Sequence, residues 1–587
     1  MLKKYKKLLT DLVFVPFRLL WSPFLVLFSG VVSSFRILLP KKEPKMGPNN
    51  PENQRNPKPL IVSKHLSQYA RHFFSGTLLS RISGMIRDIS MAAMFGDHPS
   101  VAAFMIAFRF SHFLRRLLGE GALQSIFIPH YEEIKLQDEN KAKVFFFRLS
   151  LLLSALLAVI VLVVEGGVGW ALWQQSLPRN EVLQLFAWMF PSLFFICLYG
   201  LNISLLQCHH SFFLSSFAPF VCNVVWISAI FLFAQQEISQ AMINLAIFIV
   251  IGFFIQWLIT FLKTCRTFLA GMKSIESPIF AFPKEMRSVG KATLFGLIGV
   301  AAVQFNSFID MVFAHYADLK GPVYLWYAIR LQQLPLALIG FSCVYSIVPS
   351  LSRLIKAKTI PEAQDLYFFG RRRICLLLIP CTVAIFALGF PSVNLLFGRG
   401  HFSELGVIET TWCLWAYALS LLPATLTIYQ ASLFYAYGDF KSPMIASIAS
   451  VIASITWNAA FVFLLDWGAI SIALSTSLSA AFNYVFLKNM FIKKAYWNDL
   501  VSQPLACGKL VIVSVIAFAS CMLCDRLFFH AFFYQYDVFV TPRALREQLT
   551  YFLIQLVVFA GTFSVALLAI QKELFIALKN RIFQPEG

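Results

Sequence analysis

The chain is a series of long apolar runs, most of them about twenty residues or longer, separated by short polar segments. Runs of this length match the thickness of a bilayer, and they lack the single apolar stripe of a soluble amphipathic helix. Fourteen membrane spans are predicted, at 72–95, 100–130, 145–170, 183–207, 211–234, 240–263, 289–315, 322–348, 371–397, 407–436, 442–465, 468–490, 506–529 and 549–571. The sequence therefore predicts an all-α integral membrane protein with about fourteen transmembrane helices.

Basic residues alternate between the segments that connect these spans. After even-numbered spans the chain holds Lys135, Lys141 and Lys143, then Lys263, Arg266, Lys273, Lys284, Arg287 and Lys291, then Arg353, Lys356, Lys358 and 371–373, then Lys441, and finally Lys488, Lys493 and Lys494. After odd-numbered spans it holds only Arg179, Lys320, Arg399, Arg526, Arg543 and Arg546. Because short cytoplasmic loops carry the excess of Lys and Arg, this alternation predicts that both termini are cytoplasmic.

Composition agrees with a membrane protein and excludes two other classes. Of 587 residues 58% are hydrophobic and 13% are charged, whereas about a quarter of a soluble domain is charged. The net charge of +20 resides mainly in short loops between apolar runs, so it predicts a membrane topology and no nucleic-acid partner. The chain has no nucleotide-binding, metalloprotease or hydrolase motif, no carboxylate cluster for a metal, and no predicted catalytic residue or cofactor. A transport step would then draw on an ion gradient, the membrane potential or substrate flux.

The chain carries an internal similarity. Residues 107–129 (AFRFSHFLRRLLGEGALQSIFIP) resemble residues 328–349 (AIRLQQLPLALIGFSCVYSIVP), with Arg109 matching Arg330 at an offset of 221. Pro129 matches Pro349 at an offset of 220, and Pro219 matches Pro443 at an offset of 224. Nearly equal offsets predict two pseudo-symmetric six-helix lobes followed by two further helices, and such repeats place a substrate path between lobes. Chance similarity between apolar helices is the alternative. The predicted domains are 67–270, 271–495 and 496–587.

Residues 1–66 differ from the rest. Four lysines precede an apolar stretch from Leu19 to Phe35, which is borderline in length for a span and has basic residues on both sides. An interfacial segment and a true span are both compatible with it. The following segment, rich in Pro, Asn, Lys and Glu up to Pro59, predicts a disordered linker.

Charged residues inside the predicted spans are the candidate functional residues. They are Arg81, Arg87 and Asp88 in the first span, Arg109, Arg115, Arg116 and Glu120 in the second, and Arg330 in the eighth. An arginine at mid-bilayer costs at least about 2.5–3.5 kcal/mol, so such residues normally face a hydrated cavity. The planar guanidinium suits bidentate contacts with phosphate, so the basic excess predicts a site for a diphosphate head group.

Part of this set has an interpretation without a ligand. Arg115 and Arg116 lie toward the end of a span, where basic side chains extend to the interface, and Arg87 has an acidic neighbour with which to pair. Arg81 and Arg330 have no acidic residue within one turn and are the stronger candidates. In a straight helix Arg81 and Arg87 point about 120° apart.

Asp310 in the seventh span is a further intramembrane acid. Together with Asn458 in the eleventh span it would bind Na⁺ or H⁺ for coupling. A hydrogen bond that packs two helices is the alternative, and the sequence favours that alternative.

Several motifs resemble the MurJ/MviN family of lipid II flippases. They are SRISGMIRD (80–88), FG (95–96), AFMIAF (103–108), LRRLLGEGA (114–122), FIP (127–129), YAIR (327–330), IVPSLS (347–352), LFGRGHF (396–402) and FYAYGDFKSP (434–443), within a similarity that covers 67–587. The resemblance implies a fourteen-span fold of the multidrug/oligosaccharidyl-lipid/polysaccharide exporter type, with a cationic cavity between two lobes and a groove for the polyprenyl tail in the last two spans. By motif position, the cavity arginines would be Arg81, Arg87, Arg115 and Arg330.

The chain departs from the family pattern at two positions. Ala102 and Gln333 stand where many members have acidic residues, which makes this cavity more basic and puts coupling through those carboxylates in doubt.

The resemblance implies alternating-access transport of lipid II across the bacterial inner membrane, with membrane lipids and cell-wall synthesis enzymes as partners. A flippase for another polyprenyl-diphosphate glycan and a cation-coupled drug exporter are the alternatives. The exporter would need an acidic and aromatic cavity for its cationic substrates.

Overall fold

The computed structural model describes residues 59–113, 115, 122–174, 181–209, 211–266, 304–494, 496–497, 508–529 and 544–570. The predictions for residues 1–58, for Arg116 and Glu120, and for the first part of the seventh span lie outside these residues.

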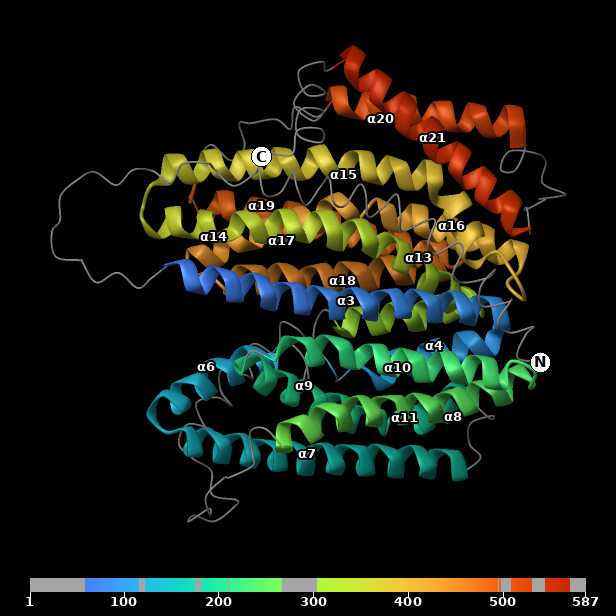
Figure 1. Cartoon of the computed structure of the whole chain (residues 1–587). Helices are drawn as coiled ribbons and strands as arrows, with labels where there is room; N and C mark the ends of the chain where they lie inside the picture. Colours follow the sequence, from blue (N-terminus) through green and yellow to red (C-terminus); the bar gives the residue numbers. More distant parts are fainter. Residues whose placement is uncertain are drawn as a thin grey trace, which may run out of the picture. The chain divides into compact units, whose positions relative to one another are not determined.

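All regular structure among the described residues is helical (Figure 1). The helices up to the middle of the chain are α3 (Pro59–Phe95), α4 (Pro99–Ser111), α6 (Ala122–Gln137), α7 (Glu139–Trp173), α8 (Glu181–Met189), α9 (Ser192–Cys208), α10 (Phe212–Phe233) and α11 (Ile238–Thr264), followed by a helix at 304–317. The remaining ones are α13 (Gly321–Pro335), the π-helix η3 (Leu336–Phe341), α14 (Ser342–Lys356), α15 (Ile360–Phe397), α16 (Glu404–Ala418), α17 (Leu421–Ala436), α18 (Lys441–Phe463), α19 (Ile470–Lys493), α20 (Gly508–Cys524), the π-helix η5 (Asp525–Phe529) and α21 (Leu545–Ile570).

The long apolar helices agree with the predicted spans. Within the described part of the chain, ten are long and apolar enough to cross a membrane, and α8 with α9, bent by 40°, would form an eleventh. Their outer faces are apolar as well, since Leu162 on α7 is 71% exposed and Ile452 on α18 is 61% exposed. Large apolar side chains in such positions are stable in contact with lipid. The prediction of an all-α membrane protein is confirmed.

Two predicted spans have interruptions. The second is not the continuous helix expected over 100–130, because α4 ends at Ser111 and a turn follows at His112 and Phe113. The eighth contains η3 directly after Pro335, which lacks the N–H that an α-helix needs at this position. Single-turn π-segments of this kind are frequent at functional sites.

The described residues form two compact units, one within Met46–Met311 and the other within Val312–Gly587. In the first unit α10 packs along α3 and α11, and α4 packs on α8 and α11. In the second unit α15 packs on α14, α16, α17, α20 and α21. The predicted domain boundaries remain predictions.

In the second unit, the last two spans are joined to α15 by buried polar contacts. Gln548 of α21 donates to the side-chain oxygen of Asn394 at 3.3 Å and to the carbonyl of Gly398 at 3.1 Å. Tyr551, one turn farther along α21, donates to the buried carboxylate of Asp525 at 2.5 Å. A hydrogen bond between membrane helices contributes about 0.6–2 kcal/mol. The α20–α21 hairpin is therefore an integral part of the second unit.

Candidate functional site: buried arginines on two membrane helices

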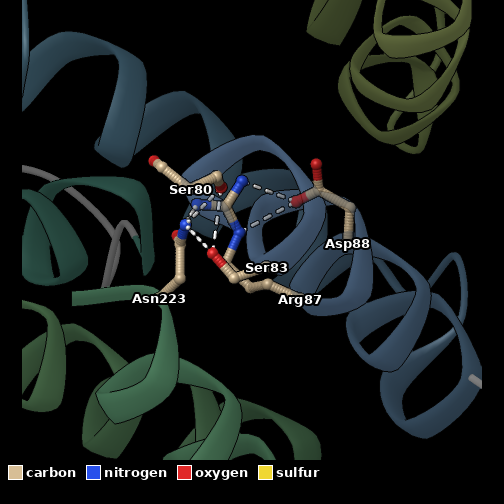
Figure 2. Close-up of polar contacts among 5 residues, drawn as sticks. All are labelled: Ser80, Ser83, Arg87, Asp88 and Asn223. Atoms are coloured by element: carbon tan, nitrogen blue, oxygen red, sulfur yellow. Dashed lines mark hydrogen bonds and ion pairs between the residues drawn. The ribbon is translucent and has the colours of Figure 1, made fainter. Parts of the chain in front are cut away.

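A polar cluster between α3 and α10 is centred on Arg87 (Figure 2). Arg87 donates twice to the same oxygen of Asp88, from Nε at 3.0 Å and from Nη2 at 2.8 Å. Asp88 is 3% exposed and the Arg87 side chain is 12% exposed, so the ion pair is shielded from solvent. The pairing of Arg87 with its acidic neighbour, one of the two interpretations of the sequence, is present.

Asn223 of α10 completes the cluster from the opposite side (Figure 2). Its side-chain oxygen accepts from Arg87 Nη1 at 3.0 Å, while its Nδ2 donates to the Ser80 carbonyl at 3.1 Å and to Ser83 Oγ at 2.9 Å. Three of the five N–H donors of a guanidinium are thus engaged with described residues. Arg87 is held in one orientation and retains two donors for an anion.

The register of α3 explains why these residues meet. The side of α3 that faces α10 consists of Gly76, Ser80, Ser83 and Arg87, at spacings of four, three and four residues. Such spacing aligns side chains along one face of a helix. A Cβ at Gly76 would lie 2.7 Å from the Cβ of Ser216, so glycine is required for α10 to approach this closely. The small residues of α3 thereby allow Asn223 to reach Arg87.

Arg87 also lies against an aromatic ring that the sequence did not single out. Its guanidinium carbon is 4.3 Å from the centre of the Trp226 ring, and Trp226 is 3% exposed. Trp226 follows Asn223 by three residues, so both project from the same face of α10. A cation over a tryptophan ring contributes about 0.5–2 kcal/mol, more when it is desolvated.

Arg115 belongs to the same unit. It follows the turn at His112 and Phe113, its side chain is half-buried, and its backbone N–H donates to the His112 carbonyl at 3.2 Å. The Trp226 ring beneath Arg87 packs on Phe108, and Phe108 stacks on His112 at this turn. One row of packed rings therefore connects Arg87 to the turn that precedes Arg115.

The other predicted residues of the first unit have different environments. Arg81 is exposed, in agreement with the expected angle of about 120° from Arg87. Arg109 is half-buried in the last turn of α4. Arg116 lies outside the described residues.

Arg330 is presented by α13 in the second unit. Its guanidinium carbon lies 4.6 Å from the centre of the Trp326 ring, one helical turn earlier, and the side chain is half-buried. Gln332, two residues later, is 5% exposed and donates to Ser420 Oγ at 3.1 Å, which fixes α13 against the start of α17. Arg330 and Arg87 therefore share one feature, a guanidinium placed over a buried tryptophan.

Asp310 and Asn458 lie in different units and each is buried. The Asp310 carboxylate accepts a hydrogen bond from Asn306 at 3.2 Å, one turn earlier in the same helix. No group of three potential metal ligands occurs among the residues that the structure describes. A role in cation coupling stays a prediction for this pair.

Asn223 and Trp226 are the site residues that sequence reasoning missed. The available signal was the stripe Gly76, Ser80, Ser83 and Arg87, which indicates a close helix neighbour. Which helix fills that place depends on tertiary packing, and an uncharged amide within an apolar run has no feature that marks it in advance.

Replacement of Asn223 by alanine is expected to lower the free energy of unfolding by about 1–3 kcal/mol, because Arg87 and Ser83 lose a buried partner. Thermal unfolding of the purified protein in detergent measures this change. The control is Asn244→Ala, which removes a half-buried amide on α11 whose hydrogen bond to Gln236 is exposed, and it should change stability by less than about 0.5 kcal/mol. Equal effects of the two substitutions would contradict the role assigned to Asn223.

Comparison with known proteins agrees with this description. A family model described as lipid II flippase MurJ matches residues 91–543. A protein of Chlamydia muridarum named probable lipid II flippase MurJ is 34% identical over 392 residues, which cover 66% of this chain and 71% of that relative. One of Vibrio cholerae with the same name is 30% identical over 449 residues, covering 73% and 83% of the two chains.

Solved structures show the same fold. The structure of a lipid II flippase MurJ in an inward closed conformation matches with a TM-score of 0.67 at 22% identity, covering 86% of this chain and 99% of that one. An inward-facing multidrug resistance transporter of the MATE family in the MOP superfamily matches with a TM-score of 0.56 at 13% identity, covering 73% and 100% of the two chains.

Proposed function

Because this chain belongs to the lipid II flippase MurJ family, we propose that it moves lipid II from the cytoplasmic to the outer leaflet of the bacterial cytoplasmic membrane. The family model covers most of the chain, and the described helices are those of a multi-pass membrane protein. The alternation of basic loops places both termini on the cytoplasmic side in this proposal.

One observation supports the head-group chemistry above all others. Arg87 is held by Asp88, Asn223 and Trp226 within the helix bundle and retains two N–H donors. Removing a guanidinium from water costs free energy. A ligand that binds the Arg87 guanidinium in one orientation would explain why α3 and α10 hold it in place. A diphosphate offers charge-assisted, bidentate acceptors for such a fork. Arg81, Arg115 and Arg330 would supply further contacts.

The proposed transport involves no covalent step. The head group binds the arginines, the lobes alternate in access, and the polyprenyl tail stays in lipid along α20 and α21. The driving force in this proposal is a Na⁺ or H⁺ gradient, for which Asp310 is a candidate coupling residue, or the membrane potential. Contacts with cell-wall synthesis enzymes remain a prediction.

Depletion of the protein in its host tests the assignment directly. We expect lipid II to accumulate in the cytoplasmic leaflet, while other polyprenyl-linked glycans stay at their normal level. Accumulation of a different polyprenyl-diphosphate glycan would favour the first alternative. Unchanged lipid intermediates with a raised sensitivity to cationic drugs would favour the exporter.

A further inference from the structure

Within the first unit, a line of packed aromatic rings begins beneath Arg87 and ends at the turn in the second span. Trp226, whose ring lies under the Arg87 guanidinium, packs on Phe108 of α4 with ring centres 5.2 Å apart. Phe108 in turn stacks on His112, with ring centres 4.1 Å apart and planes inclined by 28°. These three rings join α10, which carries Trp226, to the last turn of α4.

His112 is the residue at which α4 ends. Its backbone N–H donates to the Phe108 carbonyl at 3.2 Å, and its ring Nδ1 donates to the same oxygen at 2.7 Å. The ring also packs on Phe253 of α11, and the residue is 8% exposed. The orientation of the chain as it leaves α4 is thus fixed by the ring that ends the aromatic line, and Arg115 follows three residues later.

Tightly packed rings of this kind transmit a displacement because the interior leaves little free volume. An anion that binds the two remaining donors of Arg87 meets a guanidinium whose position is set by the Trp226 ring and by the bond to Asp88. Any movement of Trp226 is opposed by Phe108, and Phe108 is stacked on the ring that sets the turn before Arg115.

We propose that Trp226 is a positioning residue that, through Phe108 and His112, makes Arg87 and Arg115 act as one anion site. This inference rests on the proposed function, since the anion is the diphosphate of the lipid substrate. Trp226 itself does not contact the ligand in this scheme. It sets the plane of the Arg87 guanidinium and, through Phe108 and His112, the placement of Arg115.

A double-mutant cycle on the purified full-length protein tests this proposal, with lipid II in detergent micelles as the probe and its dissociation constant as the measurement. Trp226→Leu removes the ring under Arg87 and should weaken binding about tenfold. Arg115→Ala should weaken binding about ten- to a hundredfold by loss of a charged contact. The loss of affinity in the double variant should be about fivefold smaller than the product of the two single losses, because either substitution already breaks the shared site.

Trp257 provides the matched control. It is a tryptophan of α11 in the same unit that packs on Phe195, Phe254 and Phe261. Trp257→Leu combined with Arg115→Ala should give the full product of the single effects. If the affinity losses of Trp226→Leu and Arg115→Ala also multiply in full in their double variant, the proposal is overturned.

A conservative variant protects the test against a simple loss of folding. Trp226→Tyr keeps a ring face under Arg87, so it should restore most of the binding and the coupling to Arg115. If Trp226→Leu does not fold, the cycle is run with Trp226→Phe, whose face attracts a cation less strongly and should weaken binding about threefold. If the unmodified protein binds no lipid II, the proposed function fails, whereas binding without coupling removes only this inference.

Discussion

Replacement of Arg330 or of Arg81 by alanine is expected to abolish growth of a flippase-depleted strain that depends on this protein. Each substitution deletes a guanidinium, and a charged hydrogen bond of this type accounts for about ten- to a hundredfold in affinity. Arg330→Ala also leaves the Trp326 ring without its cation. The measurement is colony formation on depletion, together with immunodetection of the protein in the membrane fraction.

Two controls separate the loss of a ligand contact from the loss of a charge. Arg330→Lys keeps the charge but loses the planar fork, so partial complementation is expected. Arg372→Ala removes an exposed arginine of α15 and should complement fully. Full complementation by both Arg330→Ala and Arg81→Ala would refute the proposed head-group site.

Asp88→Ala is expected to produce the largest loss of stability in the first unit. It leaves Arg87, 12% exposed, without the carboxylate at 2.8 Å, and breaking a buried ion pair costs about 3–5 kcal/mol. Thermal unfolding in detergent would show a marked decrease in the transition temperature and a lower yield of folded protein.

The double variant Arg87→Met/Asp88→Leu tests the physical cause. Removing both charges of a buried pair is often neutral or stabilising, so thermal stability should return while complementation stays lost. A double variant that transports normally would show that the pair is structural only. A double variant as unstable as Asp88→Ala would show that the unpaired charge is not the source of the instability.

The helical architecture was predictable because lipid imposes a length and a polarity on every span. The runs over 145–170 and 442–465 agree with α7 and α18 to within a few residues at most boundaries. The interruption of the second span at His112 was not predictable, because no proline or glycine occurs between Ser100 and Leu118. At this turn the His112 ring stacks on Phe108 of α4 and packs on Phe253 of α11, and the second contact depends on tertiary packing.

The candidate site was predictable to the level of residue type only. An arginine inside an apolar run indicates an unusual environment wherever the helix packs. Its partners are set by the approach of α10 to Gly76, which depends on two helices far apart in the sequence. The sequence therefore identified Arg87, and the packing supplied Asn223 and Trp226.

The contacts of Gln548 and Tyr551 with α15 and Asp525 have a practical consequence for the study of the last two spans. Truncation of the chain before α20 would deprive Asn394 and the Gly398 carbonyl of a buried partner. The inactivity of a truncated protein would then follow from lost packing contacts in the helix bundle. Its phenotype would not show whether a polyprenyl tail binds along α20 and α21. Substitutions on the outer face of α21, such as at the 69%-exposed Val557, address that surface without this confusion.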